Sequence, residues 1–68
     1  MKEGSPTVEV AVIFTGVETE NAYQIVDPAS DEVLWIPFSQ TEERHGALKG
    51  GEGTIIISEW IAEKTGLL

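Results

Sequence analysis

The side chains able to do acid–base chemistry in this sequence are mainly carboxylates, together with one histidine and no cysteine. The histidine, His45, follows Glu42, Glu43 and Arg44. A serine–histidine–carboxylate set with Ser39 is formally available, but no serine lies in the strand-to-helix elbow that exposes a hydrolase nucleophile. We therefore interpret His45 as a solvated side chain on a polar turn, and we predict that the protein is not an enzyme.

Metal and cofactor sites are not indicated either. Oxygen ligands suited to calcium gather in one segment, at Asp27, Ser30, Asp31 and Glu32. Their spacing is not that of an EF-hand loop, and Pro28 interrupts them. The glycine-rich residues 50–53 lack the lysine and the following helix of a phosphate-binding loop. Thiolate sites need cysteine, so the sequence predicts no metal and no cofactor.

The charge of the chain narrows the choice of partners. Twelve acidic residues against four basic ones give a net charge of −8. Nucleic acids and anionic membranes bind proteins through Lys and Arg, so direct binding to either is disfavoured. The acidity is typical of a surface that only keeps the protein in solution, or of a surface that meets a basic protein partner.

The first half of the chain reads as a β-meander. Residues 7–15 alternate, with Val8, Val10, Val12 and Phe14 on one face. A second strand is predicted over 22–26, paired antiparallel with the first because the polar connection between them is too short for a crossover. Residues 27–31 read as a proline turn. A third strand then covers 32–36 and ends at Pro37, which cannot donate a backbone hydrogen bond.

The second half has weaker signals until its end. Ser39 and Glu42 match a capping box, so a short helical turn or an irregular excursion is expected there. Residues 47–53 read as a flexible glycine loop, and 54–57 as a fourth strand with both faces covered. Ser58 is placed as the N-cap of a helix that stops at Gly66.

These elements predict an α+β fold, mainly β: a three- to four-stranded antiparallel sheet or small open barrel with a short C-terminal helix. Residues 1–6 are expected to form a flexible tail, and residues 7–68 a single β-rich domain. Trp35 and Trp60 are expected to lie in contact. The predicted core comprises Phe14, Tyr23, Trp35, Ile36, Ile56, Trp60 and Ile61.

Two segments carry a resemblance. The run Trp35-Ile36-Pro37-Phe38-Ser39-Gln40 and the ending Ser58–Leu67 resemble a group of small uncharacterised phage and prophage proteins. Those proteins carry a Trp-Ile-Pro-x-Ser-Gln segment after a β-hairpin and end in Trp-x-Ala-Glu-x-x-Gly-Leu. Phe38 stands where they often have a basic residue. The resemblance implies a phage-type accessory protein, and the first six residues lack the apolar segment of a signal peptide. We expect it in the cytoplasm of a bacterial host.

The leading hypothesis is therefore a non-enzymatic accessory protein that binds another protein through its acidic loops. An inhibitor of a host defence nuclease, or of another nucleic-acid-handling protein, is the most concrete form, comparable to an anti-CRISPR protein or a DNA mimic. The alternative is a structural module that self-associates through a sheet edge, with the strand over 7–15 as the leading candidate. Monomer and homodimer both stay open. The residues expected to contact the partner are Glu18, Glu20, Asp27, Asp31, Glu32, Glu42 and Glu43.

Overall fold

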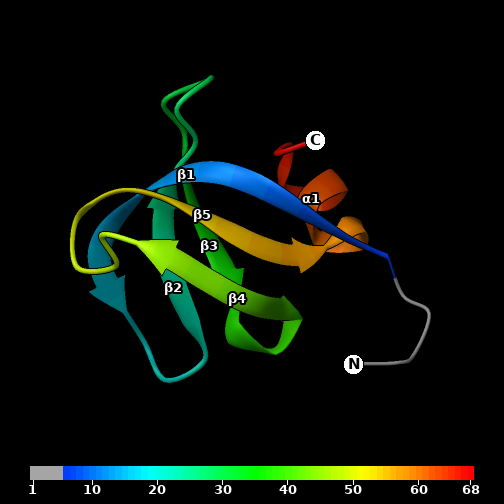
Figure 1. Cartoon of the computed structure of the whole chain (residues 1–68), viewed down its shortest axis with the longest axis horizontal. Coiled ribbons are helices and arrows are strands. Elements are labelled where there is room, and N and C mark those ends of the chain that lie inside the picture. The colour runs from blue at the N-terminus through cyan, green and yellow to red at the C-terminus, as the bar shows by residue number, and fades with distance from the viewer. Residues whose placement is uncertain (1–5) are drawn as a thin grey trace.

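The structure, a computed structural model, describes residues 6–68, and within them five antiparallel strands form one open sheet (Figure 1). The strand order is β3-β2-β1-β5-β4. A short helix follows the last strand. The elements are β1 (Thr7–Glu18), β2 (Ala22–Val26), β3 (Val33–Pro37), a 3-10 turn (Phe38–Gln40), β4 (Thr41–Gly46), β5 (Gly51–Ser58) and α1 (Glu59–Thr65). The prediction of a mainly β, antiparallel fold with a short C-terminal helix is confirmed, with one strand more than expected.

Strand β1 lies at the centre of the sheet. It pairs with β2 on one side, where Phe14 lies opposite Ile25, and with β5 on the other, where Val8 lies opposite Ile57. Both edges of β1 are therefore occupied. The expectation that this strand offers a free edge for self-association is wrong, because the chain returns after β4 and places β5 against it. The free edges of the sheet are β3 and β4.

The hairpin of β2 and β3 follows the prediction closely. Strand β2 has the predicted bounds, and β3 begins and ends one residue later than expected. In the turn, an Asp27 carboxylate oxygen accepts from the Ala29 N–H at 3.0 Å, and the Asp27 N–H donates to the Glu32 carbonyl at 2.9 Å. Asp31 has a positive φ of 62°. Its short polar side chain tolerates this left-handed conformation.

The segment after Pro37 departs from the prediction. Ser39 does not cap a helix: the 3-10 turn has no side-chain cap, and Thr41 begins strand β4. Thr41, and not Ser39, makes the side-chain hydrogen bonds of this segment. Its hydroxyl donates to the Pro37 carbonyl at 2.9 Å and lies 2.8 Å from the hydroxyl of Tyr23. Strand β5 also starts earlier than expected, at Gly51.

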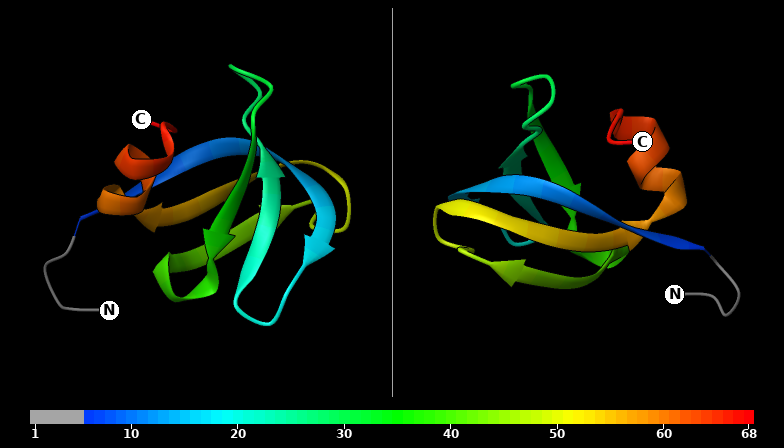
Figure 2. Two further views of the ribbon diagram at one scale, coloured as in Figure 1. Left: turned by 180° about the vertical axis from the view of Figure 1, so that it is seen from behind. Right: turned by 45° about the horizontal axis from the view of Figure 1, so that its top comes forward.

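Helix α1 has the predicted caps. The Ser58 hydroxyl accepts from the Ile61 N–H at 3.3 Å. At the other end, Gly66 adopts a left-handed φ of 84°, and its N–H reaches the carbonyls of Ala62 and Glu63. Glycine adopts this conformation without the steric cost of a Cβ. Helix α1 lies beside β1 and β5 (Figure 2). Its buried residues are Ile61 and Ala62.

The core lies on the inner, concave side of the sheet and beneath α1. Its buried members are Val12, Phe14, Tyr23, Ile25, Ile36, Ile55, Ile57, Ile61 and Ala62. Tyr23 lies at its centre, with its ring centroid 6.4 Å from that of Phe14 and 5.1 Å from that of Phe38.

Three predicted core residues do not lie there. Trp35 is 45% exposed, Trp60 is 60% exposed, and Ile56 is only half-buried. In β3 the inward positions belong to Leu34 and Ile36, so Trp35 points outward. In α1 the inward positions are Ile61 and Ala62, so Trp60 faces away. The aromatic pairs among residues 6–68 are Phe14–Tyr23 and Tyr23–Phe38, so the expected contact between the two tryptophans is not found.

The predicted tail falls mostly outside the described residues, which begin at Pro6. The Pro6 carbonyl accepts a hydrogen bond from the Glu59 N–H at 3.0 Å, next to the start of β1. No helix among the described residues is long and apolar enough to cross a membrane.

Candidate functional site

The predicted acidic residues are spread over three places. Glu18 and Glu20 lie at the connection between β1 and β2, whereas Asp27, Asp31 and Glu32 lie in the connection between β2 and β3. These two connections are at opposite ends of β2, so the acids of the two loops do not form one patch. Glu42 and Glu43 lie on the edge strand β4.

Glu18 has a structural partner. Its carboxylate lies 3.0 Å from the guanidinium of Arg44, and that guanidinium stacks on two aromatic rings. The Arg44 Cζ is 4.8 Å from the centroid of Tyr23 and 4.9 Å from that of Phe38. Such stacking of a cation on aromatic faces stabilises a fold by about 0.5–2 kcal/mol. Glu18 therefore helps hold Arg44 where β4 approaches β2.

The outer face of the sheet carries a different set of side chains. We define the outer face as the strand positions whose neighbours along the chain point into the core, and their side chains alternate with the buried ones. The outer face comprises Glu9, Ala11, Ile13, Gln24, Val26, Val33, Trp35, Glu43, His45, Glu52, Thr54 and Ile56.

An apolar row crosses this face from one edge of the sheet. Val33 of β3 lies opposite Val26, Val26 lies opposite Ile13, and Ile13 lies opposite Glu52 of β5. Val33 is 56% exposed, and Val26 and Ile13 are half-buried. The row thus begins with solvent-exposed apolar surface and ends in a carboxylate. Cross-strand neighbours of this kind lie close enough to act as one surface.

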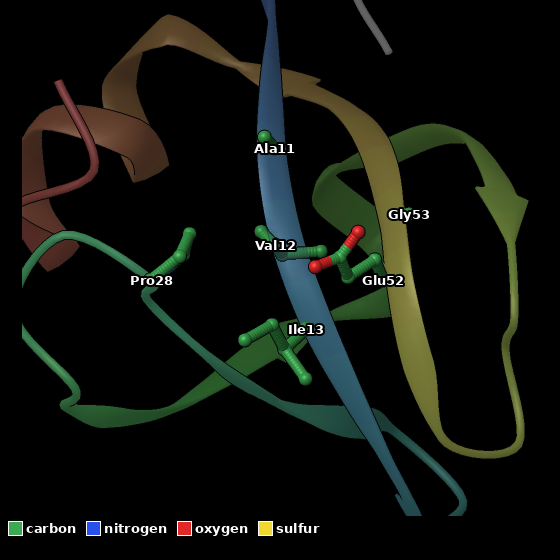
Figure 3. Close-up of a pocket in the computed structure, with 6 residues that line it drawn as sticks. All are labelled: Ala11, Val12, Ile13, Pro28, Glu52 and Gly53. Carbon is green, nitrogen blue, oxygen red and sulfur yellow. The ribbon is translucent and has the colours of Figure 1, made fainter.

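A hollow of about 300 Å³ lies at the carboxylate end of the row (Figure 3). Ala11, Ile13 and Pro28 supply apolar walls, and the Glu52 side chain extends from β5 toward β1 on the opposite side. Pro28 comes from the turn between β2 and β3, so a residue far from β5 in the sequence completes the hollow. An apolar wall facing one carboxylate suits a ligand group with an aliphatic body and a positive end, such as a Lys or Arg side chain.

Two further carboxylates lie on the outer face, four residues away from the row along β1 and β5. Glu9 and Glu43 lie on either side of Ile56, which pairs with both. Within residues 6–68 Arg44 pairs with Glu18 and His45 shares a hydrogen bond with Glu43, so neither Glu9 nor Glu52 is neutralised by a described base. None of the outer-face positions holds a Lys or Arg. The outer face therefore combines apolar surface with uncompensated negative charge.

Glu9 and Glu52 were not among the residues expected to contact a partner. Glu9 lies in the predicted first strand, and Glu52 lies in what reads as a glycine loop. The alternation of β5 brings Glu52 to the outer face once the strand is extended back to Gly51. If the two alternating strands are paired in register, both residues are predicted to lie on the outer face.

His45 lies on the same face and does not meet Ser39. Its Nε2 is 2.7 Å from a carboxylate oxygen of Glu43, two residues away on β4. Over the part of the chain that the structure describes, no group of three or more His, Cys, Asp or Glu side chains is placed to hold a metal ion.

Compared with family models, with curated proteins and with solved structures, the chain gives no match in any of the three.

Proposed function

We propose that this protein is a non-enzymatic binding module. Its outer sheet face binds a protein partner whose surface carries Lys or Arg among apolar side chains. The observation that carries the proposal is the row from Val33 through Val26 and Ile13 to Glu52. The apolar part of the row gives area to bury, and the carboxylate end gives charge complementarity. This moves the proposed contact from the acidic loops to the face of the sheet.

The hollow beside Glu52 gives the proposal an anchor. A Lys or Arg side chain from the partner would lay its methylene groups on Ala11, Ile13 and Pro28 and direct its charge to Glu52. Glu9 and Glu43 would add charge at the rim of the contact. Rim charges mainly steer association, whereas a desolvated pair in the hollow slows dissociation.

The class of partner follows from the same chemistry. Proteins that handle nucleic acids display Lys and Arg to bind phosphates, and such a surface is complementary to a face that carries carboxylates and no base. A net charge of −8 and the resemblance to small phage proteins support an accessory role in which this protein occupies a nucleic-acid-binding surface. A host defence nuclease is the most concrete partner within that class.

The proposal is tested by charge reversal with matched net charge. The outer-face variant carries Glu9→Lys and Glu52→Lys, and the control carries Glu20→Lys and Glu63→Lys, both exposed and off that face. Each tagged protein is used to capture host proteins for mass spectrometry, and the dissociation constant of the captured partner is then measured. We expect the outer-face variant to weaken binding at least about tenfold and the control to weaken it much less.

Two results would count against the proposal. One is a partner that binds the outer-face variant as tightly as the wild type. The other is binding that is insensitive to salt, since exposed charge pairs are screened by added ions. Circular dichroism of both variants shows that they are folded before binding is compared.

A further inference from the structure

The two free edges of the sheet differ in how they are protected. Strand β4 carries Glu42 and Glu43 and has a register shift between Thr41 and Glu43. Charges and bulges of this kind discourage pairing with another strand. Strand β3 has neither over Val33–Trp35, where its pairing with β2 is regular and Val33 and Trp35 are 56% and 45% exposed.

The backbone of β3 offers hydrogen bonds at this edge. The Asp27 N–H donates to Glu32 and the Phe38 N–H donates to Asn21, which fixes the alternation of the antiparallel ladder. Leu34 and Ile36 therefore direct their backbone groups to β2. Val33 and Trp35 direct theirs away from the sheet, and over residues 6–68 no hydrogen bond to another element engages them.

Pro37 limits the free edge to these two residues. It has no N–H, and its outward carbonyl already accepts from the Thr41 hydroxyl. The edge thus presents two donors and two acceptors, flanked on the outer face by two exposed apolar side chains. An extended strand satisfies such an alternating set with its own backbone groups.

We propose that β3 pairs antiparallel with β3 of a second copy of the chain, about a two-fold axis at Leu34. In this register Val33 of one copy lies opposite Trp35 of the other, and the reverse. The four backbone groups of each copy then find partners, giving four hydrogen bonds across the axis. Each exposed Val33 packs beside a tryptophan ring, and the unpaired Pro37 falls outside the bonded region.

Antiparallel pairing also keeps the negative charges of the two copies apart. The acids nearest β3 are Asp31 and Glu32, which precede it, whereas Ser39 and Gln40 follow Pro37 and are neutral. In the proposed register each Glu32 lies opposite Ile36 of the other copy. The two Glu32 residues are then about 13 Å apart along the strands, beyond the screening length of about 8 Å at physiological salt. The pairing of the two β3 strands does not require a basic partner. It joins the outer faces of the two copies into one continuous surface.

The test compares two substitutions of exposed tryptophan. Trp35→Lys places a charge at the proposed contact, and Trp60→Lys makes the same chemical change on α1, away from it. Because both lower the net negative charge equally, loss of association in one alone cannot come from charge repulsion between whole molecules. We expect sedimentation velocity to show a dimer for wild type and Trp60→Lys, and a dissociation constant raised at least about tenfold for Trp35→Lys, since a two-fold interface loses the contact twice. Val33→Lys with Val17→Lys as its control gives a second, independent pair.

Amide hydrogen exchange tells edge pairing apart from any other contact. In the dimer the Val33 and Trp35 amides exchange slowly, and dilution speeds them, whereas Leu34 and Ile36 stay protected throughout. The proposal is overturned by a wild type that is monomeric at millimolar concentration, or by a dimer in which Val33 and Trp35 exchange at unprotected rates. A monomer in which these amides become protected only on adding another protein would also overturn it, because the occupant would then be a different chain.

Discussion

The most connected side chain of the core is also its only ionisable one. Tyr23 is 1% exposed, packs at a tilt against Phe14 and Phe38, lies under Arg44 and shares a hydrogen bond with Thr41. Its ring joins three strands, β1, β2 and β4, around one phenol. A buried phenol with a satisfied hydroxyl adds both packing and specificity to a small core.

Tyr23 makes the free energy of unfolding depend on pH in the alkaline range. Burial raises the pKa of Tyr23 above its ordinary value of 10.0, and the Thr41 hydrogen bond and the Arg44 charge oppose this only in part. Because the folded state holds the proton more tightly than the unfolded state, the contribution of Tyr23 is fully present below pH about 10. We expect the free energy of unfolding to fall as the pH rises from there through the raised pKa.

Denaturant titrations at a series of alkaline pH values measure this loss. The chain has one tyrosine, so tyrosinate absorbance reports Tyr23 alone. Tyr23→Phe is the control, and its stability should change less over the same pH range. A tyrosinate transition at or below the ordinary pKa in the folded protein would contradict the prediction.

At the scale of elements, the sequence predicts well where apolar alternation and caps are clear. The alternation of β1, the bounds of β2 and both caps of α1 are confirmed. Strand β4 could not be predicted, because Thr-Glu-Glu-Arg-His-Gly has no apolar alternation. An edge strand can form when it has only a backbone partner. The inward position of β4 is occupied by Arg44, a charged residue that does not indicate a core-facing position in the sequence.

The orientation of Trp35 shows a second limit. Residues 33–36 are all apolar, so the sequence does not indicate which alternate side chains of this strand face the core. Only the pairing with β2, in which Tyr23 lies opposite Ile36, decides that Trp35 points outward. The outer-face row could not be predicted either, because its members come from four strands and only the pairing of those strands brings them together.

The two serines predicted to cap helices, Ser58 and Ser39, give a test at this scale. Ser58→Ala removes the acceptor for the Ile61 N–H and leaves Gln40 without the Ser58 hydroxyl, 2.7 Å away. We expect it to lower the free energy of unfolding by about 1–2 kcal/mol. Ser39→Ala is the matched control, because Ser39 is exposed and caps nothing, and its effect should stay within about 0.5 kcal/mol. Urea denaturation measures both, and equal losses would show that Ser58 does not act as a cap.

At the scale of the whole molecule, negative charge dominates. The net charge is −8, and among the described residues one ion pair, Arg44–Glu18, joins an acid to an Arg or Lys. Repulsion among unpaired carboxylates destabilises a compact state, and salt screens it.

Added sodium chloride should therefore raise the melting temperature. Calorimetry at low and at moderate salt measures the change, which we expect to correspond to about 1 kcal/mol or less. Glu20→Gln removes one exposed charge and should reduce the salt effect. A melting temperature that falls with added salt would mean that attractive pairs outweigh the repulsion.

The position of β1 also has a consequence that we expect for folding. The first strand of the sheet pairs along its length with the fifth, so that Thr7 lies opposite Ser58 and Val8 opposite Ile57. Before β5 meets it, β1 has only the short strand β2 on one side, and its other edge is a long row of unpaired amides. Contacts between segments so distant in sequence slow folding, because the intervening chain must be ordered before they form. The nascent protein is therefore most exposed to aggregation along β1, in the interval before the last strand is added.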